Sequence, residues 1–307
     1  MDVLSKRPVA TGRTLERLIS ETAEPHLEPH ILGMARKVLV RDGELLSKEL
    51  KTDYPHIFHL PDCPPSQVDS CLADLARLLK SINRQKVKER CGQCLELAIF
   101  RALCAETDVQ YFGRFPDFDP TAPTRPNKLF RKEEPPCHIG NRSIIGDRPL
   151  DFIYFHPTAG PAGLEAKNLR EWLYPQGSEV KELLIKCIAL DCVPILVARR
   201  LPSVTIELLG TCGVVLHQTL NQLYSSKDKE LASYAMQQDL LCFDDIKVGD
   251  EPDSRLTNLT SNILPEFLPK ARARFDKFKD LLARYANSDI AYHELAECVL
   301  LRETGKR

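Results

Sequence analysis

The stretch LDFIYFHPTAGPAGLEAKNL, residues 150–169, decides the fold. Its first six residues are rich in β-forming side chains, and a turn segment with two prolines and two glycines follows them. This pattern predicts a β-hairpin whose second strand carries Glu165, Ala166 and Lys167. Because alternate side chains of a strand share a face, Glu165 and Lys167 are expected to project together.

The hairpin is expected to bring Asp151, on the first strand, beside Glu165. Two neighbouring carboxylates repel each other, and a hard divalent cation removes that penalty. Oxygen ligands from Asp151, Glu165 and the backbone carbonyl of Ala166, completed by water, suit Mg²⁺. We therefore expect a Mg²⁺ site here, in which Mn²⁺ can substitute.

The segments around the hairpin predict further regular structure. Helices are expected at 87–104, with Glu96 in its middle, and at 178–190; strands are expected at 109–116, 193–198 and 213–218. The order is helix, three strands, helix, two strands. This order favours an α/β core with a mixed sheet.

The acidic residues and the lysine together resemble the PD-(D/E)XK nuclease superfamily, which has the restriction-endonuclease-like fold. The matching motif reads Pro149-Leu150-Asp151, then thirteen residues, then Glu165-Ala166-Lys167. The resemblance covers roughly residues 88–218 and implies an αβββαβ core. It also implies that Glu96, on the first core helix, joins the metal site. The motif is short, so the order of elements around it carries most of the resemblance.

The resemblance implies hydrolysis of phosphodiester bonds. Asp151 and Glu165 would hold the cation, Glu96 would hold a metal-bound water or a second ion, and Lys167 would orient or deprotonate the attacking water. A helix carboxylate facing solvent is the competing interpretation of Glu96.

Basic and polar residues near these elements are candidates for contact with nucleic acid. They are Asn168, Arg170, Arg199, Arg200, Lys270, Arg272 and Arg274. The last three belong to an amphipathic segment, 270–285, that is equally typical of a solvated surface helix.

The chain divides by pattern into three regions. Residues 1–62 are expected to be helical, with the helix-turn-helix-wing rhythm of a winged helix, and PDCPPS at 61–66 breaks the pattern. Residues 63–225 would form the nuclease-like core with an insertion at 116–145. Residues 226–307 would form a helical C-terminal region.

Composition limits the class of protein. Apolar residues make up 43% of the 307 and charged residues 28%, and no apolar run is long enough to cross a bilayer. The N-terminus has no apolar signal segment, so a cytoplasmic protein with eleven reduced cysteines is expected. A net charge of −1 means that a polyanion must be held by local basic patches.

These observations favour a Mg²⁺-dependent endonuclease that acts on DNA, with a homodimer as a further expectation from the resemblance. One alternative is a catalytically inactive module of nuclease fold that binds nucleic acid or protein. The other is an unrelated α/β protein in which Glu165 and Lys167 form a surface ion pair.

Overall fold

The computed structural model describes residues 2–22, 24, 27–49, 56–106, 109–122, 129–144, 146 and 148–305. Contacts group the chain into two compact units: unit 1 holds residues 1–91 and 221–249, and unit 2 holds residues 92–220 and 250–307. Each unit is built from two separate stretches of the chain, whereas the three regions predicted from the sequence are continuous. Those three regions stay a prediction.

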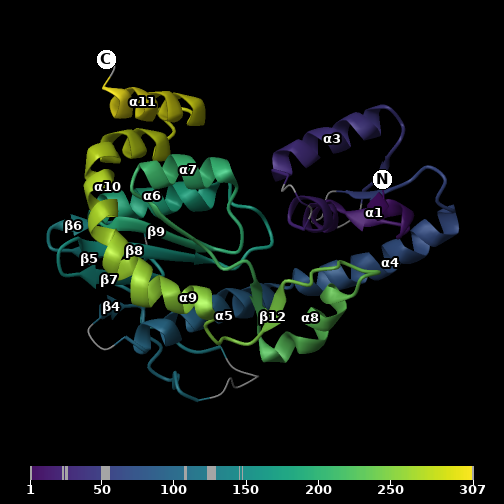
Figure 1. The fold of residues 1–307 in the computed structure, drawn as a ribbon. Helices are drawn as coiled ribbons and strands as arrows, with labels where there is room; N and C mark the ends of the chain where they lie inside the picture. The colour runs from purple at the N-terminus through teal and green to yellow at the C-terminus, as the bar shows by residue number, and fades with distance from the viewer. Residues whose placement is uncertain are drawn as a thin grey trace. The chain divides into compact units, whose positions relative to one another are not determined.

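Five strands form the central sheet of unit 2, in the order β10-β9-β8-β7-β4. Their bounds are β4 Gln110–Phe112, β7 Phe152–His156, β8 Gly160–Lys167, β9 Val193–Ala198 and β10 Val215–Gln218. Figure 1 labels β4, β7, β8 and β9. Strand β7 is antiparallel to β4 and β8, whereas β9 is parallel to β8 and β10. The chain is therefore an α/β protein with a mixed sheet, as its sequence predicts.

The hairpin predicted from the opening stretch is formed by β7 and β8. Phe152 pairs with Leu164, and His156 pairs with Gly160 at the turn. Gly160 has a φ of +72°, a conformation that glycine adopts without steric cost, so the chain reverses tightly there. This register places Asp151 next to Glu165 along the two strands.

Helices complete unit 2. Their bounds are α5 Gln85–Cys104, which begins in unit 1, α6 Ser178–Leu190, α7 Ser203–Thr211, α9 Ser254–Asn258, η3 Leu259–Ile263, α10 Leu264–Ala286 and α11 Tyr292–Thr304. Helix α6 and strand β9 have the bounds that the sequence predicts. Helix α7 was not predicted. It supplies the crossover that the parallel strands β9 and β10 require.

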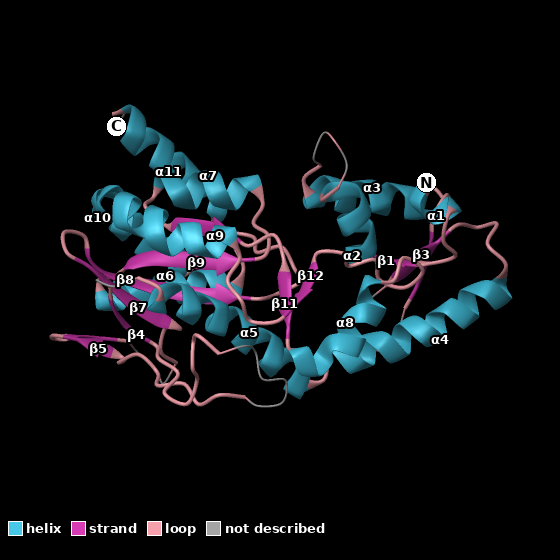
Figure 2. Ribbon diagram, turned by 60° about the horizontal axis from the view of Figure 1, so that its bottom comes forward, coloured by secondary structure: helices cyan, strands magenta, loops and turns pink. Residues whose placement is uncertain are grey.

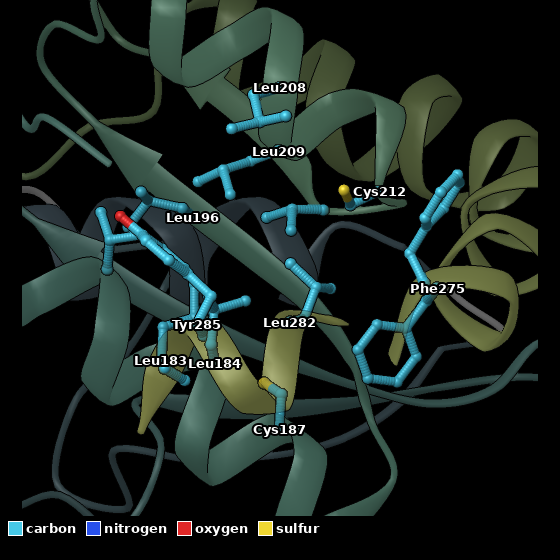
Figure 3. Packing of buried hydrophobic residues seen from close by; sticks show 14 of the residues in the cluster. Leu183, Leu184, Cys187, Leu196, Leu208, Leu209, Cys212, Phe275, Leu282 and Tyr285 are labelled. Atoms are coloured by element: carbon cyan, nitrogen blue, oxygen red, sulfur yellow. The ribbon is translucent and has the colours of Figure 1, made fainter. Parts of the chain in front are cut away.

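Figure 3 shows the core on one side of this sheet. Leucines of α6, β9 and α7 meet Phe275, Leu282 and Tyr285 of α10, and all of them are buried. All six residues of β9 are buried as well, because a central strand packs on both of its faces. This packing fixes β8, which lies between β9 and the hairpin strand β7.

The N-terminal part of unit 1 contains both helices and strands (Figure 2). The elements are α1 Asp2–Ser5, β1 Ala10–Thr11, α2 Gly12–Leu15, η1 Glu16–Ser20, α3 Pro29–Arg41, β2 Leu46–Lys48 and β3 Ile57–His59. The three strands form an antiparallel sheet in the order β1-β3-β2. The predicted helical region thus includes a small sheet. The wing predicted at residues 54–60 contains β3, and its first two residues lie outside the described residues.

The rest of unit 1 packs helix α4 Pro65–Ile82 against α8 Lys229–Met236. The short 3₁₀ helix η2 Ser226–Asp228 precedes α8, and β11 Gln222–Tyr224 pairs in parallel with β12 Ile246–Val248. Strand β12 lies in the region predicted to be helical, and three residues are too few to give a periodic signal. Throughout the described residues, no helix is both long and apolar enough to span a membrane.

Candidate catalytic and metal site

Asp151 directly precedes strand β7 and is tied to the neighbouring strand. Its Oδ2 accepts a hydrogen bond of 2.7 Å from the backbone amide of Ala166. A carboxylate that accepts a backbone N–H is held in one orientation. The bond therefore fixes Asp151 at the strand position between Glu165 and Lys167.

Gly113, which follows β4, allows the backbone to approach Asp151 closely. A Cβ built on Gly113 would lie 2.5 Å from the Asp151 carbonyl oxygen and 2.7 Å from Cδ1 of Phe152. Its φ of +104° also disfavours any residue with a side chain. The position of Asp151 thus depends on a glycine at the adjacent strand end.

Glu165 lies in the interior, with a relative exposure of 2%. Its Oε2 accepts from Nζ of Lys167 at 2.6 Å, and its Oε1 accepts from Nζ of Lys186 at 2.6 Å. Lys186, on α6, also donates to the carbonyl of Pro149 at 3.0 Å. Glu165 and Lys167 are therefore not a surface ion pair, and the interpretation of the triplet as one is wrong.

Glu96 of α5 is bonded to a lysine from the predicted insertion. Nζ of Lys132 lies 2.7 Å from Glu96 Oε2 and 3.6 Å from Asp151 Oδ1. The Lys132 side chain is 9% exposed and that of Glu96 is 20% exposed. Glu96 thus faces the site rather than solvent.

Burial and the nearby Asp151 carboxylate raise the pKa of Glu96 and of Glu165. Burial, followed by repulsion from Asp151, raises the pKa of Glu96 to about 7 even with Lys132 beside it. The same two causes raise the pKa of Glu165. Burial disfavours the charged amine of Lys167, but the Glu165 and Asp151 carboxylates outweigh burial and raise its pKa. The carboxylates of the site therefore keep Lys167 protonated.

The donor set suits a hard cation, since carboxylate oxygens are the ligands that Mg²⁺ and Mn²⁺ prefer. Among the described residues, no group of three or more histidine, cysteine, aspartate or glutamate side chains is arranged to hold a metal ion. An ion bound to Asp151 and Glu165 would need water and a backbone carbonyl, such as that of Ala166, to complete its ligands. The mutual repulsion of the carboxylates is the feature that such an ion would relieve.

Residues expected to contact nucleic acid near β8 and β9 lie mostly inside the protein. Relative exposures are 7% for Asn168, 6% for Arg170 and 1% for Arg199. The guanidinium of Arg199 donates to the backbone carbonyl of Arg170 at 2.6 Å. Arg200 is partly exposed, so of these four residues it is the one best placed to reach a phosphate.

The basic face of α10 is largely neutralised within unit 2. Arg272 pairs with Asp191 at 2.9 Å and with Asp276 at 3.1 Å, and Arg274 pairs with Glu303 of α11 at 2.9 Å. Lys270 is exposed. Of the three predicted contacts on this helix, Lys270 is therefore the one that no described carboxylate neutralises.

The sequence analysis missed Lys132 and Lys186. Lys186 stands three residues after Leu183 and four before Leu190, so it occupies the apolar face of α6. A charge on that face is a signal that something buried must pair with it. Lys132 had no such signal, because it lies in a polar segment without periodicity.

Comparison with known proteins adds no assignment: no family model, curated protein or solved structure matches the chain.

Proposed function

We propose that this protein is a divalent-metal-dependent endonuclease of restriction-endonuclease-like fold that acts on DNA. The observation that carries the proposal is the convergence of Asp151, Glu165 and Lys167 at adjacent ends of β7 and β8, with Glu96 beside Asp151. The elements α5, β4, β7, β8, α6 and β9 support it, because their order is the αβββαβ order of the nuclease core. The short strands β5 His138–Ile139 and β6 Arg142–Ser143, which pair with each other between β4 and β7, belong to the predicted insertion. The proposal also includes a cytoplasmic location and assembly as a homodimer.

The side chains have distinct parts in the proposed reaction. Mg²⁺ held by Asp151 and Glu165 would polarise the scissile phosphate and make a bound water more acidic. Lys167 is kept protonated by its carboxylate neighbours, so it is suited to offset the charge that grows on the phosphate in the transition state. Lys186 holds the carboxylate of Glu165 in place, and the Ala166 amide does the same for Asp151.

The balance of charges favours a second candidate function, an inactive nuclease-fold module that binds nucleic acid or protein. The carboxyl groups of Glu96, Asp151 and Glu165 face the amines of Lys132, Lys167 and Lys186, so three acidic groups meet three basic ones. A balanced cluster of this kind is a stable arrangement without any ion. The two functions differ in whether a phosphodiester bond is cut.

Incubation of the protein with supercoiled plasmid distinguishes the two candidate functions. With Mg²⁺ or Mn²⁺ we expect nicked or linear products, and with EDTA none. Asp151→Asn, Glu165→Gln and Lys167→Met should each lower the rate by at least about 10²-fold. Lys277→Met on α10, remote in sequence and paired with Glu303, is the matched control and should cut at the wild-type rate. An intact plasmid under all conditions, together with DNA retardation in a gel, would favour the inactive module.

A further inference from the structure

Lys132 bridges two of the three carboxylates in the site. Its amine lies 2.7 Å from Glu96 and 3.6 Å from Asp151, and 3.8 Å from the more exposed Glu134. The ring of Phe152 lies 4.9 Å from the amine, in the geometry of a cation–π contact. The amine therefore occupies a cation position between Glu96 and Asp151.

Hydrogen bonds to core elements hold the segment that carries Lys132. The side-chain amide of Gln93, on α5, both donates to and accepts from the Phe130 backbone, at 2.8 Å in each direction. The Glu133 amide donates to the Arg114 carbonyl at 2.7 Å, next to the end of β4. These hydrogen bonds, at Phe130 and at Glu133, hold the backbone on both sides of Lys132. They therefore fix the position of its amine.

Within the described part of the chain, no lysine or arginine bridges Asp151 and Glu165 in this way. Lys167 and Lys186 each pair with Glu165 and with neither Asp151 nor Glu96. Among the described residues, Lys132 is the only lysine or arginine within 4.0 Å of two of the three carboxylates. The position between Glu96 and Asp151 is therefore filled by an amine of the protein itself, whereas none of these amines lies within 4.0 Å of both Asp151 and Glu165.

Nucleases that use two metal ions place them about 3.5–4 Å apart on shared carboxylates. An ammonium held between Glu96 and Asp151 excludes an ion from the same place by its volume and by its like charge. We propose that Lys132 replaces a second metal ion, so that the site binds one divalent cation, between Asp151 and Glu165. Lys132 is then a positioning residue that neutralises Glu96. This inference rests on the proposed metal site.

The test counts Mn²⁺ ions bound to the DNA-free protein, by titration followed with electron paramagnetic resonance of free Mn²⁺. Wild-type protein should bind one ion per chain, and Asp151→Asn should bind none. Lys132→Met, which keeps the length of the side chain and removes its charge, should bind two. The second ion should be lost again in the double variant Lys132→Met with Glu96→Gln, and Lys132→Arg should bind one. Lys277→Met is the control and should match the wild type.

Two bound ions in the wild-type protein, or one in Lys132→Met, would overturn the inference. The wild-type count decides the question even if Lys132→Met fails to fold, which a thermal melt would reveal. A wild-type protein that binds two ions and cuts plasmid refutes the role of Lys132 and leaves the proposed function standing. A wild-type protein that binds no ion refutes both.

Discussion

Nζ of Lys186 lies 2.6 Å from Oε1 of Glu165, and both side chains are buried between α6 and β8. Removing one partner of a buried ion pair costs about 3–5 kcal/mol, and here Lys167 still pairs with the other oxygen of Glu165. Lys186→Met should therefore lower the free energy of unfolding by about 3 kcal/mol, the lower end of that range, as measured by urea denaturation. This loss of stability is large because the ion pair is buried, whereas loss of an exposed ion pair costs much less.

The exposed pair of Lys277 and Glu303 gives the matched comparison. Lys277→Met removes a lysine from an ion pair at the surface, where solvent screens the attraction, so stability should stay close to that of the wild type. Equal stabilities of the two variants would contradict the description of Glu165 as a buried, lysine-held carboxylate.

Glu96 should make the metal-free protein less stable as pH rises. Its pKa rises from 4.5 to about 7 on folding, so between these values the folded protein holds a proton that the unfolded chain has released. The free energy of unfolding then falls with increasing pH across this window, by about 3 kcal/mol in all. Glu96→Gln does not titrate, so its stability relative to the wild type should improve from pH 5 to pH 8. Thermal melts in EDTA at several pH values measure this, and parallel profiles would refute the raised pKa.

Asp191 directly follows the last residue of α6 and forms ion pairs with Arg142, Arg272 and Lys279. Burial alone would raise its pKa, but hydrogen bonds from Lys279 and Arg272 outweigh burial and lower the pKa to about 2. A lowered pKa gives stability that is present above pH 4 and is lost as the pH falls towards 2.

Asp191→Asn tests this arrangement, because asparagine tolerates the left-handed φ of 56° at this position. The variant should be about 1–2 kcal/mol less stable than the wild type at pH 7, and the difference should shrink as the pH approaches 2. Chemical denaturation at pH 7 and pH 2.5 gives both values. A difference that is constant with pH would mean that the ion pairs contribute nothing measurable.

Gly113→Ala should disturb the site without removing any of its groups. The added Cβ would meet the Asp151 carbonyl at 2.5 Å, so the end of β7 must shift. Overpacking of this kind costs about 1–3 kcal/mol of stability, and a displaced ligand should weaken Mn²⁺ binding as well. Gly140→Ala is a suitable control, since its φ of +60° is also left-handed but no atom lies within 4 Å of its Cβ. Equal Mn²⁺ affinity in both variants would show that Asp151 tolerates the shift.

The sequence predicted the hairpin, helix α6 and strand β9 because their signals are local. The β-forming residues at 150–155 and the Pro/Gly turn after them locate β7 and β8, and helical periodicity sets the bounds of α6. The predictions were less accurate for residues whose ion-pair partners lie far away in the sequence. Arg272 and Arg274 read as free basic residues because Asp191 and Glu303 lie far from them in sequence.

Lys132 shows the same limit at the site itself. Nothing in a polar, proline-rich stretch indicates that one lysine is carried to Glu96, 36 residues earlier in the chain. The position follows from the backbone anchors at Phe130 and Glu133, which only the folded chain reveals.

The central claim is that Asp151 and Glu165 together hold a divalent cation. Anomalous scattering from crystals soaked in Mn²⁺ tests it most directly. The account predicts a peak within about 2.0–2.6 Å of a carboxylate oxygen of both residues. A protein that takes up Mn²⁺ only elsewhere, or shows no peak at these carboxylates, would contradict it.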